Sequence, residues 1–172
     1  MTSELRVDKI IPTTGAPTGG GGGIVQTTVG RLTSHFADST NQSYMASGLI
    51  TTMTPRFSNS KFFVQMNGGR IKARNASGMN VKMYVSLNGG SYAAAYSGNR
   101  GDTFYYSSSG EIQVPHSFTD LYTPSVAITS TIAFQPYWRS FNGGEVSFNV
   151  SDSNSYGEVV MTVMDVSAYC QN

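Results

Sequence analysis

The clearest pattern in the chain is the strict alternation of apolar and polar residues from Met79 to Leu87. Apolar side chains occupy every second position, and asparagine, lysine, tyrosine and serine fill the positions between them. Because successive side chains of a β-strand point to opposite faces, this pattern predicts a half-buried strand. Asn88-Gly89-Gly90 follows it directly. Asn-Gly pairs favour the left-handed conformations of a tight hairpin turn, so we expect the chain to reverse there.

The same alternation recurs along the rest of the chain. It precedes Asn67-Gly68-Gly69 and follows Asn142-Gly143-Gly144, so both tripeptides are also interpreted as turns. No window shows apolar residues at helical spacing over three turns. About eight to nine strands therefore predict an all-β fold, an antiparallel β-sandwich or jelly roll. The strands are expected at Ile24 to Thr33, Leu49 to Thr54, Phe62 to Met66, Met79 to Leu87, Phe104 to Tyr106, Glu111 to His116, Val126 to Phe134, Val146 to Val150 and Glu158 to Val166.

A run of five glycines, Gly19 to Gly23, divides the chain. Glycine has no side chain to bury and the largest backbone entropy, so the run predicts either a flexible joint or a place where chains approach closely. Ahead of it, Leu5 to Ile11 has the pattern of one short strand, which is too small to fold alone. It would pair either with an edge of the domain's own sheet or with another protein by strand addition. We therefore expect residues 1–23 to form an extended N-terminal arm with a glycine-rich linker, and residues 24–172 to form the β-sandwich domain. The apolar side chains expected to dock are Leu5, Val7, Ile10 and Ile11.

Composition narrows the function classes. Lysine and arginine total 11 against 10 acidic residues, a formal charge of +1, so we expect no nucleic-acid partner that depends on counterion release. No apolar run approaches the roughly 18 residues of a membrane span, so we expect no membrane-spanning segment. The single Cys170 cannot form an internal disulfide.

Few residues offer catalytic or metal-binding chemistry. His35 and His116 are the two histidines, and neither has metal-ligand spacing or a cysteine companion. After Pro115 at the end of a predicted strand, His116 is expected at the surface. Asp152 to Glu158 resembles part of a calcium loop, but its twelfth position would be Val163, which cannot ligate, so an asparagine- and serine-rich turn is the favoured interpretation. We expect no enzyme activity, no metal and no cofactor.

Aromatic residues provide the remaining candidate contacts. Tyrosine and tryptophan rings stack on apolar faces of sugars, but aromatics are also common in strands, where they pack sheets together. Among those near predicted loops, we select Tyr105, Tyr106 and Trp138 as candidate surface or receptor contacts, with packing as the competing interpretation.

Several segments together carry a resemblance. The opening Ser3-Glu4-Leu5-Arg6-Val7-Asp8-Lys9-Ile10, followed by threonine, proline and glycine, resembles the N-terminal segment of bacteriophage virion proteins, notably fibres of phages of marine bacteria and cyanobacteria. The domain start Gly23-Ile24-Val25-Gln26 and the stretch Leu49 to Val64 are similar to the β domain that often follows. The tail, Ser153 to Gly157 leading into Val159 to Val166, is also similar. Arg56-Phe57 interrupts the family pattern, and residues 73–134 match it only in strand periodicity.

The resemblance implies a virion structural protein without catalytic residues. It would be a homotrimeric fibre or spike component, from a tail fibre or a short head fibre, attached to other virion proteins by the arm and displaying the β domain for host attachment. A capsid decoration protein is the alternative within this class. A glycan-binding lectin or a hydrolase is the less favoured class, and a host-surface glycan is the partner that the aromatic residues suggest.

Overall fold

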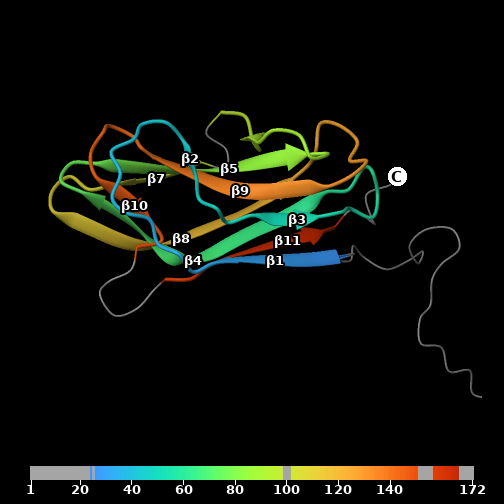
Figure 1. Ribbon diagram of the computed structural model, residues 1–172, viewed down its shortest axis with the longest axis horizontal. Coiled ribbons are helices and arrows are strands. Elements are labelled where there is room, and N and C mark those ends of the chain that lie inside the picture. Colours follow the sequence, from blue (N-terminus) through green and yellow to red (C-terminus); the bar gives the residue numbers. More distant parts are fainter. Residues whose placement is uncertain (1–23, 25, 99–101, 151–156, 167–172) are drawn as a thin grey trace, which may run out of the picture.

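A computed structural model describes residues 24, 26–98, 102–150 and 157–166 of the chain, and none of these residues is helical. Eleven β-strands form two antiparallel sheets that lie one above the other (Figure 1). Sheet A contains β1 (Gln26–Leu32), β4 (Phe62–Arg74), β8 (Glu111–Tyr122), β10 (Val146–Phe148) and β11 (Val159–Asp165). Sheet B contains β2 (Met45–Ala46), β3 (Thr51–Met53), β5 (Gly78–Leu87), β6 (Ala93–Ala94), β7 (Asp102–Tyr106) and β9 (Ile132–Ser140).

The strand order is that of a jelly roll. Three pairs of strands share one edge of a neighbour: β2 and β3 on β9, β6 and β7 on β5, and β10 and β11 on β4. Eleven strands less these three shared positions leave eight rows. Numbered along the chain, the rows follow the order 1-8-3-6 in sheet A and 2-7-4-5 in sheet B. The pairs 1 with 8, 2 with 7, 3 with 6 and 4 with 5 result when one long antiparallel ribbon wraps on itself into two sheets.

The core fills the space between the sheets. Phe62, Val64 and Met66 on β4 face Met79, Val81 and Met83 on β5, and all six are almost completely buried. Phe62 and Phe134 meet across the layers with ring centroids 5.9 Å apart. The period-two alternation therefore does what the sequence predicts: it supplies one buried face to each sheet. The prediction of an all-β antiparallel sandwich is confirmed.

One predicted turn is wrong. Asn67-Gly68-Gly69 lies within β4, where the pairing with β8 shifts register between Gly68 and Arg70. Gly68 and Gly69 have φ angles of 92° and 65°, which glycine adopts without the steric cost of a side chain. The bulge divides β4 into two segments that share the partner β8: the first pairs with β11 on its other edge and the second with β10.

The other two turn predictions are confirmed. Asn88 and Gly89 have φ angles of 55° and 73°, and the Gly90 amide donates to the Leu87 carbonyl at 3.0 Å, so the chain reverses after β5. Asn142-Gly143-Gly144 connects β9 of sheet B to β10 of sheet A. The expected arm, with Leu5, Val7, Ile10 and Ile11, lies outside the described residues, as do Cys170 and most of the calcium-like stretch. Within the described part of the chain, no helix has the length and hydrophobicity needed to cross a membrane.

Candidate binding face on the outer side of sheet B

Aromatic side chains gather on the outer face of sheet B, the side that points away from the core. On β5, the core takes Met79, Val81 and Met83, so Asn80, Lys82 and Tyr84 must face outward. The same alternation on β7 places Phe104 and Tyr106 on this face. The outer face of sheet B therefore has large aromatic side chains that packing of the core does not require.

Three rings form a half-exposed aromatic platform at one end of this face. Phe104, Tyr106 and Phe141 are 51%, 49% and 55% exposed. The Phe104 ring stacks beside Tyr106 with centroids 6.3 Å apart and meets the edge of Phe141 at 5.2 Å. Gly78 makes room for them, because a Cβ at this position would lie 2.7 Å from the Phe104 ring. A contiguous apolar surface of this kind is a typical contact site.

Four tyrosines form a second cluster on the same face. Tyr84 and Tyr137 stack with centroids 4.2 Å apart. Tyr44 lies 5.8 Å from Tyr84, and Tyr92 lies 6.1 Å from Tyr137. They come from β5, β9 and the segments that flank β2 and β6, so the topology and not the local sequence brings them together.

A polar network connects the two aromatic clusters. Asn80 pairs with Phe104 on one neighbouring strand and with Arg139 on the other. The Asp102 carboxylate accepts hydrogen bonds from the Tyr44 hydroxyl and from Asn80 Nδ2, both at 3.2 Å. The Arg139 guanidinium lies 4.6 Å from the centre of the Tyr44 ring, a cation–π contact.

The phenols of this network are protonated, and its two cations form no salt bridge with a described carboxylate. Burial, followed by the nearby Asp102 carboxylate, raises the pKa of the Tyr44 hydroxyl to about 12. Burial also raises the pKa of Tyr84. Both hydroxyls are therefore hydrogen-bond donors at neutral pH. Lys82 donates to the Gly98 carbonyl at 2.9 Å, and neither Lys82 nor Arg139 forms a salt bridge with any carboxylate in the described parts of the chain.

The structure places the three predicted contact residues in different environments. Tyr106 is on the aromatic platform. Tyr105, its neighbour on the strand, points the opposite way, toward the core, and its hydroxyl lies 3.1 Å from His116 Nδ1. Trp138 is 2% exposed and packs against Phe148 and Phe36, so the prediction of a surface contact is wrong for this residue. Trp138 lies four positions after Phe134 on β9, so both side chains point to the core. Burial of its large apolar ring stabilises the fold.

The surface position expected for His116 is also wrong. The ring is 2% exposed, and burial lowers the pKa of His116 to about 4. Its edges meet Tyr105 of sheet B and Phe148 of sheet A. A buried imidazole with one hydrogen bond is a structural element of the interior, and no group of three or more potential metal ligands occurs among the described residues.

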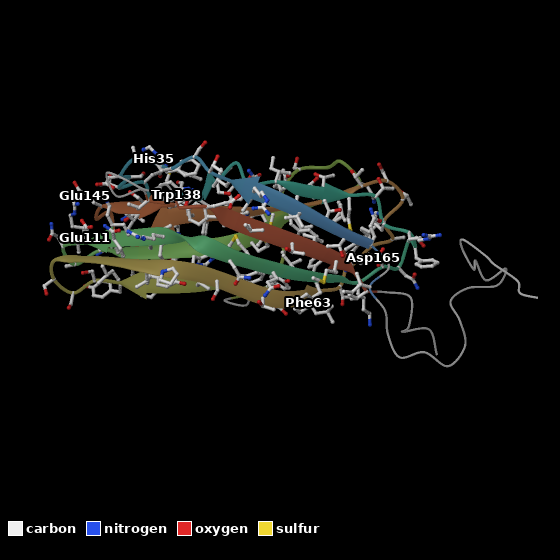
Figure 2. The ribbon with its side chains drawn as sticks, turned by 90° about the horizontal axis from the view of Figure 1, so that it is seen from below. His35, Phe63, Glu111, Trp138, Glu145 and Asp165 are labelled. Carbon is white, nitrogen blue, oxygen red and sulfur yellow. The ribbon has the colours of Figure 1, made fainter. Side chains whose placement is uncertain are left out.

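Charged residues lie at the end of sheet A where Glu111 and Glu145 are found (Figure 2). Lys72 and Arg74 on β4 pair with Asp38, and Arg74 also reaches Glu111 and Glu145. Burial raises the pKa of Asp38, but the hydrogen bonds from Lys72 and Ser147 and the nearby cations outweigh burial and hold it below its usual range. Each carboxylate of this network already pairs with a cation of the same network.

The remaining outer face of sheet A differs from that of sheet B. Figure 2 shows it with β8, β4, β11 and β1 side by side. The cross-strand row Thr27, Met164, Phe63 and Leu121 is its most apolar part, and Phe63 is the one aromatic residue in the row. An open groove of about 410 Å³ lies beside Ser58–Lys61 and Thr123–Ala127, with mainly small polar side chains around it.

Comparisons with known proteins give no assignment. No family model matches the chain, and no curated protein matches it. A solved structure of infectious bursal disease virus, Gx strain, is similar over 92% of this chain and 42% of that chain, with 12% identity and a TM-score of 0.32. The chain therefore spans less than half of the length of that protein, and a likeness of this strength supports no statement about function.

Proposed function

We propose that this chain is a non-enzymatic structural component of a bacteriophage virion, a fibre or spike protein that displays its jelly roll for contact with a host surface. In this proposal, residues 1–23 attach the protein to other virion proteins, and the protein assembles as a homotrimer. The resemblance of the N-terminal segment and of the domain start to phage fibres is the basis for the virion assignment.

One observation supports the division into a tethered side and a displayed side. The described chain enters at β1 and leaves at β11, both of which belong to sheet A, and Gln26 pairs with Asp165 at that point. The half-exposed aromatic rings lie on the outer face of sheet B, the opposite side of the sandwich. A domain held through sheet A leaves the aromatic face open to a partner.

Removal of residues 1–23 tests the proposal. We expect the truncated protein to remain folded and oligomeric but to be absent from purified particles, as judged by mass measurement of the free protein and by immunoblotting of virions. A full-length variant in which serine replaces Leu5, Val7, Ile10 and Ile11 separates the loss of docking side chains from the loss of length. Normal incorporation of both variants would overturn the proposal.

The decoration alternative predicts a different stoichiometry. A decoration protein would be present in proportion to the capsid subunits, whereas a fibre or spike would be present at few sites. Quantitative mass spectrometry of particles separates these two outcomes.

A further inference from the structure

We propose that the outer face of sheet B binds an acidic glycan, whose sugar rings pack on the platform of Phe104 and Tyr106 and whose carboxylates pair with Arg139 and Lys82. This inference deepens the proposed function, on which its biological role as host contact rests. The binding itself is a property of the face and is testable without particles.

The arrangement of the face indicates a partner that is amphipathic over short distances. A half-exposed ring surface made by Phe104 and Tyr106 lies next to the hydrogen-bonding network of Asn80 and Asp102. A sugar ring has an apolar face of C–H groups and an equatorial rim of hydroxyls, so it can contact a ring and a polar network at the same time. Aromatic side chains with a few placed polar groups are typical of sites for small polar ligands.

Two buried polar atoms within the network have no hydrogen-bond partner in the described parts of the chain. Asn80 is 7% exposed, and its Oδ1 has no hydrogen-bond partner among the described residues, while its Nδ2 donates to Asp102. Nε of Arg139, which lies opposite Asn80 on β9, is likewise unpaired there. Buried polar atoms without partners cost free energy. Because both atoms are almost inaccessible to solvent, a ligand on this face does not reach them, and the contacts it can make are with the exposed rings and the charged groups around the network.

Charge favours an acidic ligand over a neutral one. The face has two cations, Lys82 and Arg139, against the single carboxylate of Asp102. Asp102 already accepts two hydrogen bonds, whereas neither cation has a carboxylate within salt-bridge distance in the described residues. A bound carboxylate would complete both cations, and its interaction with them should weaken as salt rises.

The test compares two polymers that differ only in charge. Immobilised polygalacturonate and its carboxyl-reduced neutral form are exposed to the full-length protein at low and at physiological salt. We expect binding to polygalacturonate to be about tenfold tighter or more, as for a hydrogen-bonded ion pair, and the difference to shrink as salt rises. Equal affinity for the two polymers, or no binding to either, would overturn the inference.

Variants assign the two components of binding. Phe104→Ala should weaken binding to both polymers, whereas Arg139→Gln or Lys82→Gln should weaken binding only to the acidic one. Phe57→Ala and Arg31→Gln are matched controls away from this face and should bind as the native protein does. Unfolding curves identify any variant that is unstable, in which case Tyr106→Ala replaces Phe104→Ala.

Two outcomes distinguish this inference from its alternatives. If Phe104→Ala makes the oligomer dissociate in solution and neither polymer binds, the face is a contact between copies of this chain and the glycan inference fails. If no polymer binds but incorporation into particles still depends on residues 1–23, the proposed function stands and only the glycan inference fails.

Discussion

Replacement of His116 by glutamine should remove most of the acid sensitivity of the fold between pH 6.5 and about pH 5. The imidazole is 2% exposed on β8, lies between the two sheets, and shares one hydrogen bond with Tyr105. Burial lowers the pKa of His116 from 6.5 to about 4. The folded protein therefore keeps the ring neutral over a pH range in which the unfolded chain binds a proton.

The magnitude follows from linkage between protonation and folding. Each pKa unit corresponds to about 1.4 kcal/mol, so the shift at His116 represents a loss of about 3 kcal/mol of unfolding free energy. Because the unfolded state binds more protons than the folded state in this window, stability falls as the pH decreases. The loss of unfolding free energy is absent above pH 6.5 and approaches its full size near the folded pKa of about 4.

Denaturant unfolding at half-unit steps from pH 7.5 to pH 4.5 measures this dependence. The single tryptophan, Trp138, is buried, so its fluorescence reports the transition. His116→Gln should give a nearly flat profile from pH 7.5 to about pH 5, and His116→Phe should do the same if glutamine destabilises the core too strongly. His35→Gln, at an exposed position, is the matched variant that carries the same substitution outside the core.

Carboxyl groups contribute at the acidic end of this window. Hydrogen bonds from Gln113 and Arg74 hold the pKa of Glu111 below its usual range, and the pKa of Asp38 is also lowered, so the unfolded chain binds protons at these groups before the folded protein does, from about pH 5 downward. The reasoning is refuted if His116→Gln loses as much stability as the native protein between pH 6.5 and about pH 5, above the range of these carboxyl groups. It is also refuted if NMR shows His116 titrating near 6.5 in the folded state.

Two further predictions concern packing. Gly68→Ala should lower the free energy of unfolding by about 2–4 kcal/mol, because the φ of Gly68 is 92° and a Cβ would clash with the Glu158 carbonyl oxygen. Gly89 has a φ of 73° but open space around it, so Gly89→Ala should lower the free energy of unfolding by about 1–2 kcal/mol. Denaturant midpoints of the two variants check the difference, and equal losses would contradict the bulge geometry. Trp138→Ala should cost about 3–5 kcal/mol as a core truncation, while Tyr106→Ala should change stability by less than about 1 kcal/mol. A stable Trp138→Ala protein would contradict the buried position of this ring.

The alternation in the sequence was sufficient to predict the sandwich but not the strand pairing. Met79 to Leu87 has one apolar face whatever its neighbours are, so its strand and the turn at Asn88 could be predicted. The pairing of β1 with β11 joins residues more than a hundred positions apart, and no local pattern encodes it. Asn67-Gly68-Gly69 has the composition of a turn, and only the continuous ladder with β8 makes it a bulge.

The wrong prediction for Trp138 has a simple cause in strand boundaries. The predicted strand ends at Phe134, whereas β9 runs from Ile132 to Ser140. If the strand is extended, Trp138 has the same parity as Phe134 and must face the core. The same rule separates Tyr105 from Tyr106, because adjacent residues of one strand cannot share a face.

The binding face illustrates what sequence periodicity leaves undetermined. Phe104 and Tyr106 share a face because they are two positions apart, but the pattern does not say whether that face is inside or outside. The long-range pairing decides it: β7 is placed beside β5, whose buried side is already taken by Met79 and Val81. Gly78 then provides the space that the Phe104 ring occupies. An aromatic pair that would ordinarily pack two sheets together is thus left half exposed, next to a polar network and two cations without carboxylate partners among the described residues.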